Sequence, residues 1–182
     1  MRRIKRFFLF VIGVSIIFSV HGVYATGFAR ARYDAAVRYI KHKQPDFALM
    51  EFRSLLREFP KSPFAQKSLF AIAEYYYDHG MHKDAIENFT RRLKDNSDLE
   101  ANIIAKVYLL KILKEIESPS QEEKEMLGGV KKELSSESAF LSFSEYKKTC
   151  YRSASLNKFK IIRHADSVDI YRNNQFFINI PQ

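Results

Sequence analysis

The sequence has a single cysteine and no tryptophan, and only 6 glycines and 5 prolines among 182 residues. A lone cysteine, Cys150, excludes a disulfide within the chain and excludes Cys-x-x-Cys redox or zinc motifs. The chain also lacks a glycine-rich phosphate loop, a Gly-x-Ser-x-Gly elbow and a His-Glu-x-x-His pair. We therefore predict a protein that is not an enzyme, with no catalytic residues, no metal ligands and no cofactor. We expect Cys150 to be buried and inert.

Basic and acidic residues are nearly balanced along the chain except at its two ends, where basic residues are in excess. The formal net charge of +9 taken alone would favour a nucleic-acid partner. Residues 1–25 carry 4 basic residues and no acidic one, residues 26–142 carry 19 basic against 18 acidic, and residues 143–182 carry 7 against 3. Because the excess lies in a leader and a small C-terminal patch, we expect no nucleic acid among the partners.

Residues 1–25 have the pattern of a secretory signal peptide. The basic segment Met1–Arg6 precedes an apolar run, Phe7–Val20, and Val23-Tyr24-Ala25 offers short residues where signal peptidase cleaves. The apolar run is shorter than the roughly 20 residues of a membrane span. We predict an exported, periplasmic protein cleaved after Ala25; the alternative is an uncleaved signal that anchors the chain in the inner membrane, facing the periplasm. With no cysteine at this site, no stable lipid anchor is expected.

Residues 29–60 and 66–97 repeat one pattern at a spacing of 37 residues, which relates Ala48 to Ala85 and Phe52 to Phe89. In each unit a helix rich in Ala and Tyr leads through a turn to an amphipathic helix. The predicted helices are Arg30–Lys43, Phe47–Phe59, Phe64–His79 and His82–Asp95, with turns at Gln44-Pro45-Asp46 and at Gly80. Close approach of helix backbones is expected at Ala36, Ala48, Ala73 and Ala85.

A third hairpin with a weaker pattern follows. Leu99–Ile116 has helical apolar spacing, and Ser118-Pro119 is typical of a helix start, with Ser118 as the cap of a second helix that runs to about Leu134. Gly128-Gly129 lies inside this helix at a cost of about 1 kcal/mol per glycine. We expect the pair to mark either close packing or a break in the helix.

The remaining segment changes to β-branched and aromatic residues, which favour strands. Turn residues separate three runs, Phe159–His164, Val168–Arg172 and Gln175–Ile180, and an extra strand within Ser142–Arg152 is the alternative. The predicted fold class is mainly α: an α-solenoid of about three helical hairpins followed by a small antiparallel β-meander. We assign 1–25 to the signal peptide, 26–138 to the helical repeats and 139–182 to the β-rich module.

The repeat resembles the tetratricopeptide (TPR) consensus. The matching residues of the second unit are Leu69, Ile72, Ala73, Tyr76, Gly80, Ala85 and Phe89. The junction Phe59-Pro60-Lys61-Ser62-Pro63-Phe64-Ala65 is similar to that of envelope TPR proteins, the BamD-like and Tol-Pal-associated superfamily, which take part in outer-membrane biogenesis. The resemblance covers residues 29–97 well and 98–135 loosely.

This resemblance implies binding of partner proteins or peptide segments in a groove formed by the first helix of each hairpin. The groove residues that it implies are Arg30, Tyr33, Val37, Ile40, Lys41, Lys67, Phe70, Glu74, Tyr77 and Asp78. We therefore expect a non-catalytic adaptor of the cell envelope. The alternative is a module that binds an envelope polymer through Lys158, Lys160 and Arg163 of the basic meander, with the helices as scaffold. A further possibility is a homo-oligomer that forms through the C-terminal strands.

Overall fold

The structure is a computed structural model that describes residues 26–95, 98–136, 138–140, 143 and 150–182. The predicted signal peptide lies outside the described residues. Within the described part, no helix combines the length and the apolar character that a membrane span needs.

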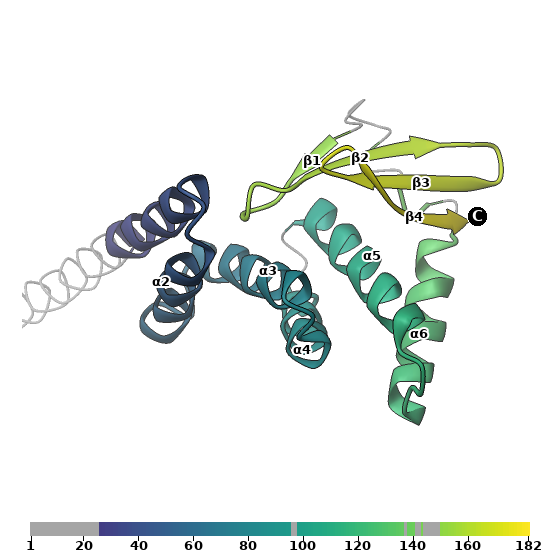
Figure 1. The fold of residues 1–182 in the computed structure, drawn as a ribbon, viewed down its shortest axis with the longest axis horizontal. Coiled ribbons are helices and arrows are strands. Elements are labelled where there is room, and N and C mark those ends of the chain that lie inside the picture. Colours follow the sequence, from purple (N-terminus) through teal and green to yellow (C-terminus); the bar gives the residue numbers. More distant parts are fainter. Residues whose placement is uncertain (1–25, 96–97, 137, 141–142, 144–149) are drawn as a thin grey trace, which may run out of the picture.

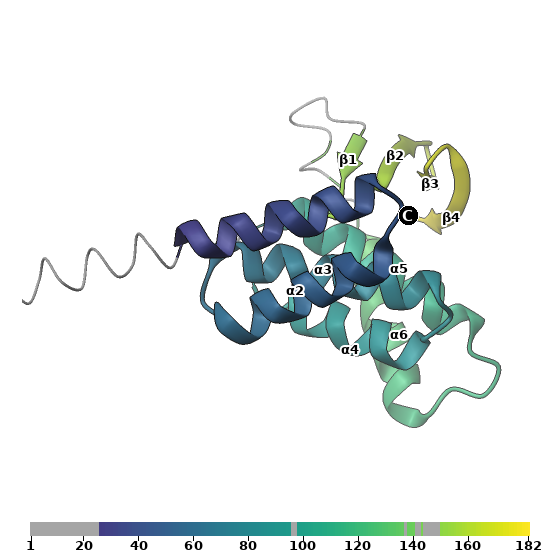
Figure 2. The same ribbon diagram turned by 60° about the vertical axis from the view of Figure 1, so that its left-hand side comes forward.

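The helices form three hairpins in a row, followed by a small sheet (Figure 1). The N-terminal helix, described over residues 26–41, pairs with α2 (Pro45–Glu58); α3 (Pro63–Asp78) pairs with α4 (His82–Arg92); and α5 (Leu99–Glu115) pairs with α6 (Gln121–Leu134). Figure 2 shows the N-terminal helix running beside α2. The predicted fold class, mainly α with a small β-meander, is confirmed.

The helix ends follow from local chemistry. Ser62 caps α3 by accepting a hydrogen bond from the backbone N–H of Ala65 at 3.2 Å, with Pro63 in the first turn. After α3 the chain turns through Gly80, whose φ of +69° is the left-handed conformation that glycine adopts without strain. The predicted cap at Ser118 is wrong: α6 is capped by Ser120, which forms a reciprocal capping box with Glu123.

The small residues expected between helices are where the hairpins pack. Ala36, Ala48, Ala73 and Ala85 are each fully buried and belong to the common core. Phe52 and Phe89 follow two of these alanines by one turn and are also buried. The four alanines are therefore core residues, and close approach of the helix backbones at them stays a prediction.

Gly128 and Gly129 neither break α6 nor mark close packing. Helix α6 continues through both residues, and a Cβ atom added to either glycine would meet nothing within 4 Å. Both predicted explanations are therefore wrong. The remaining contacts of α6 hold it against α5: Val130 and Leu134 are buried in the common core.

The sheet has four antiparallel strands in the order β1-β2-β3-β4. Its strands are β1 (Cys150–Arg152), β2 (Lys158–Arg163), β3 (Ser167–Arg172) and β4 (Gln175–Pro181). The extra strand considered within Ser142–Arg152 is β1. Cys150 is exposed rather than buried, because it pairs with Lys160 at the edge of the sheet on the face away from the helices.

The opposite face of the sheet packs on the helices. Phe159, Val168 and Ile170 point to this side and are fully buried. The ring of Tyr108 in α5 lies 5.7 Å from that of Phe159 and 5.2 Å from that of Phe177, both edge to face. Helices and sheet therefore share one core (Figure 1).

Candidate binding surface

The N-terminal helix, α3 and α5 are the first helices of the three hairpins, and we call the surface that they form the first-helix face. This is the surface on which the predicted groove residues were expected to lie open. The chain's own sheet instead covers much of it (Figure 1). Phe70 and Glu74 are 1% and 0% exposed, and the ring of Tyr77 lies 5.8 Å from that of Phe177. The expectation of an open groove along α3 is therefore wrong.

Glu74 is the centre of a buried hydrogen-bond network between α3 and the sheet. Its Oε1 accepts hydrogen bonds from the Tyr108 hydroxyl at 2.9 Å and from the Asn157 Nδ2 at 3.1 Å. Burial raises the pKa of Glu74, although hydrogen bonds from its neighbours and the charge of Arg172 oppose the shift. The network fixes α5 and the β1–β2 turn to α3.

A second polar connection lies at the end of α3. Arg172 of β3 donates to both carboxylate oxygens of Asp78, and its guanidinium lies over the rings of Tyr77 and Tyr108 at 5.7 and 5.5 Å. The contact with Asp78 raises the pKa of Arg172 against the opposing effect of burial. Asp78, predicted to bind a partner, thus binds the chain's own sheet.

The β1–β2 turn divides what remains of the first-helix face. Asn157 reaches Glu74, and the Ser155 hydroxyl lies 3.5 Å from the backbone oxygen of Ala71 in α3. Residues of this turn line two separate cavities, one with Ser155 and Asn157 in its wall and the other with Ser153 and Ala154. Two separate openings therefore remain on either side of the turn.

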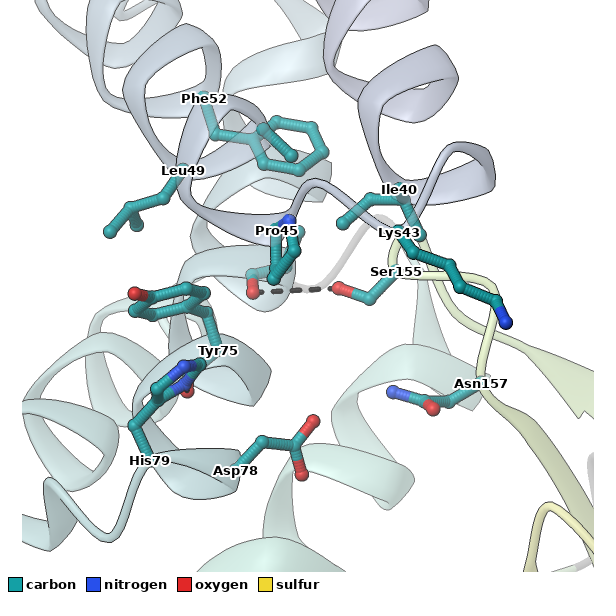
Figure 3. Close-up of a pocket in the computed structure, with 12 residues that line it drawn as sticks. Ile40, Lys43, Pro45, Leu49, Phe52, Tyr75, Asp78, His79, Ser155 and Asn157 are labelled. Carbon is teal, nitrogen blue, oxygen red and sulfur yellow. Dashed lines mark hydrogen bonds between the residues drawn. The ribbon is translucent and has the colours of Figure 1, made fainter.

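The first opening, which we call the apolar cavity, has a volume of about 390 Å³. Ile40, Leu49 and Phe52 form an apolar wall, and Tyr75 and His79 form the facing wall, where their rings stack at 4.0 Å (Figure 3). The cavity is also lined by Lys43, Pro45, Ala48, Ala71, Asp78, Ser155 and Asn157. It is a mainly apolar space with polar groups on one side, as is usual for sites that bind a side chain or small ligand.

The second opening, which we call the cationic cavity, is smaller, about 150 Å³. It brings together Lys67, Arg92 and Arg152, each from a different element, with Asp98 as the acidic residue of the lining. The aromatic rings of Tyr33, Phe70 and Tyr151 complete the wall. The aromatic residues expected in the groove thus lie beside basic ones.

The ten predicted groove residues therefore separate into several environments. Ile40 and Asp78 line the apolar cavity, while Tyr33, Lys67 and Phe70 line the cationic cavity. The other residues line neither cavity: Arg30 and Lys41 are exposed, Val37 is half-buried, and Glu74 and Tyr77 face the sheet.

The predicted basic surface of the sheet is also divided. Side chains alternate along β2, so Lys158 and Lys160 lie on the exposed outer face, whereas Arg163 is on the same side as the buried Phe159. Arg152, which the prediction left out, stands directly opposite Lys158 in the register. Arg152, Lys158 and Lys160 therefore share one face of the sheet, and Arg163 lies on the other.

The sequence did contain a signal for the covered face. In α5 the buried positions include the consecutive residues Val107, Tyr108 and Leu109, so burial extends around more of the helix than one stripe. A helix that is apolar on most sides is buried on most sides. Glu74 likewise interrupts an apolar run in α3. Asn157, Arg172 and Arg92 carried no comparable signal.

Comparison of the chain with protein-family models, with curated proteins and with solved structures found no match.

Proposed function

We propose that this chain is a non-catalytic adaptor of the bacterial cell envelope, and that it binds a segment of a partner protein at the apolar cavity. The occupant is a polypeptide segment that inserts an apolar side chain between α2 and α3. Export is supported by the signal-peptide pattern of residues 1–25 and protein binding by the TPR-like repeat.

The proposal rests on one observation: a segment of polypeptide already lies on the first-helix face next to the apolar cavity. The chain's own β1–β2 turn already lies on this face, with Asn157 and Ser155 directed at α3. The same two residues form one wall of the apolar cavity. A partner segment bound in the cavity would lie beside this turn on the same face. The volume of about 390 Å³ admits one large apolar side chain.

The test is site-specific photo-cross-linking. A benzoylphenylalanine in place of Leu49, in the wall of the apolar cavity, is expected to cross-link a discrete partner when the full chain, with residues 1–25, is produced in cells. Leu56 lies two turns further along α2, is similarly half-buried and does not line the cavity. The probe at Leu56 is the matched control and is expected to give no such product.

A blocking variant makes the result specific. Leu49→Trp fills the cavity and is expected to abolish capture of the partner identified by cross-linking, whereas Leu56→Trp retains it. Circular dichroism of both variants checks that the helices remain folded. Equal capture by the two variants would refute binding at the apolar cavity.

One observation favours a second candidate function for the sheet. Arg152 and Lys158 face each other directly across two strands, and like charges in that position destabilise a sheet. Lys160 lies beside them, opposite Tyr171, which in turn contacts the exposed Phe176. A cationic and aromatic face of this kind suits an anionic envelope polymer. Lys158→Glu with Lys160→Glu is expected to abolish polymer binding without changing the cross-link at Leu49.

A further inference from the structure

The cationic cavity contains a buried guanidinium, that of Arg92, whose hydrogen-bond partners among the described residues are all neutral oxygens. Arg92 is 2% exposed. Its Nη1 donates to the backbone oxygen of Asp95 and to the Oδ1 of Asn102, both at 2.9 Å, and its Nη2 lies 3.5 Å from the backbone oxygen of Asp98. The Nε is buried and makes no hydrogen bond among the described residues. A buried charge held only by neutral acceptors, with one donor unsatisfied, is costly unless an anion approaches it.

The remaining donors of the cavity are also available. Lys67 forms no ion pair with any described residue and its side chain is exposed at the rim, whereas the side chain of Arg152 lies on the outer face of the sheet. The Tyr33 and Tyr151 hydroxyls make no hydrogen bond within the described part of the chain, and burial raises the pKa of both, to about 12 for Tyr33. Both phenols are therefore neutral hydrogen-bond donors at physiological pH.

The lining has the composition of an anion site. We propose that the cationic cavity binds a carboxylate, held by Lys67 and Arg92 and by the phenol hydroxyls of Tyr33 and Tyr151. This site is separate from the apolar cavity and does not depend on the function proposed for it.

The charge balance favours a carboxylate over a phosphate. Lys67 and Arg92 are the two basic side chains directed to the cavity, because Arg152 stands opposite Lys158 on the outer face of the sheet. The carboxylate of Asp98 lies in the same wall, where it caps α5 by accepting from the N–H of Ala101 at 3.0 Å. A monoanion leaves this cluster near neutrality, whereas a dianionic phosphate adds repulsion from Asp98. The volume of about 150 Å³ also fits a small group rather than a whole side chain with its backbone.

The test is an NMR titration of ¹⁵N-labelled protein, residues 26–182, with sodium acetate against sodium chloride at equal ionic strength. Acetate is expected to shift the Arg92 Nε–H signal and the amide signals of Tyr151 and Ser153 in a saturable manner. Inorganic phosphate is expected to bind more weakly. Shifts that are the same in acetate and chloride would overturn the proposal, as would tighter binding of phosphate.

Variants locate the site without disturbing the buried Arg92. Lys67→Met keeps the aliphatic stem and is expected to weaken acetate binding about fivefold, and Tyr151→Phe, which removes one hydroxyl, is expected to have a similar effect. Lys131→Met, on the exposed side of α6, is the matched control and leaves the affinity unchanged. Equal affinity of all three variants would refute the assignment.

Two peptides distinguish the possible sources of the carboxylate. Acetyl-trialanine with a free C-terminus is compared with its C-terminal amide. Tighter binding of the free acid than of acetate assigns the site to a polypeptide terminus, and equal binding assigns it to a small free carboxylate. Both results support the proposal, whereas equal binding of the amide and the acid would overturn it.

Discussion

Arg172 of β3 and Asp78 at the end of α3 are 94 residues apart in the chain, yet they form a two-pronged ion pair with N–O distances of 2.6 and 2.7 Å. The Arg172 side chain is 15% exposed and that of Asp78 is 41% exposed, so the pair sits at the rim of the interface between sheet and helices. Because the same guanidinium also lies over Tyr77 and Tyr108, this residue fixes the sheet both by charge and by packing.

Asp78→Asn is expected to lower the free energy of unfolding by about 1–2 kcal/mol. Hydrogen bonds to charged groups contribute about 1.5–3 kcal/mol, and the partial exposure of Asp78 reduces that value through solvent screening. Urea denaturation measures the change. Asp34→Asn is the control, because Asp34 forms an exposed pair with Arg30 at 3.7 Å within one helix, and it should change stability by less than about 0.5 kcal/mol. Equal effects of the two substitutions would contradict a special role for the Arg172 pair.

Glu74 is expected to make the protein less stable as the pH rises. An acid whose pKa is raised by folding holds more protons in the folded state than in the unfolded one, so stability falls from the ordinary pKa of 4.5 up to the folded value. Each pH unit of that interval costs about 1.4 kcal/mol. Glu74→Gln cannot ionise and should lack this decline. Urea unfolding of both proteins over a pH series measures it, and parallel curves would show that burial does not raise the pKa of Glu74.

The helices and the sheet are expected to unfold in one transition. Tyr108 is fully buried between Phe89 of α4 and Phe159 and Phe177 of the sheet, so loss of either layer exposes the same ring. Far-ultraviolet circular dichroism and the near-ultraviolet signal of the tyrosines should therefore give the same midpoint in urea. A chain of residues 26–138, which lacks the sheet, should bind an apolar dye and unfold at a lower urea concentration. An unchanged midpoint for this shorter chain would show that the sheet is an independent accessory.

The elements of the fold could be predicted because their signals are local. The repeat at a spacing of 37 residues, the turn at Gly80 and the proline at the start of α2 placed the first two hairpins to within a few residues. Runs of β-branched and aromatic residues separated by turn residues likewise located β2, β3 and β4. The error at the start of α6 arose because Ser118 and Ser120 offered similar caps: Gln121 lies three residues after Ser118 and Glu123 three residues after Ser120, and either can complete a capping box.

The candidate site could not be predicted in the same way, because it depends on where the sheet packs. The resemblance to TPR proteins implied an open groove, and each predicted residue of α3 was assigned by its position on the helix. Residues such as Phe70 suit either an open groove or a covered one, because an aromatic side chain fits both. The sheet contributes Tyr151, Asn157 and Arg172 to this face, and nothing local to their sequence indicates contact with helices some 80 to 94 residues away.

The glycines of α6 are expected to be sites where alanine stabilises the protein. Gly128 and Gly129 have helical conformations with open space where a Cβ atom would lie, so Gly128→Ala and Gly129→Ala should each raise the free energy of unfolding by about 0.5–1 kcal/mol. Gly80 also has open space for a Cβ atom, but its φ is +69°, and Gly80→Ala should therefore destabilise the protein by about 1–2 kcal/mol. Urea denaturation measures the free energy of unfolding of the three variants. All three glycines have open space for a Cβ atom, so the expected difference in sign comes from the backbone conformation. A loss of stability in the α6 variants would indicate that the exposed side of α6 contacts another chain or another part of the protein.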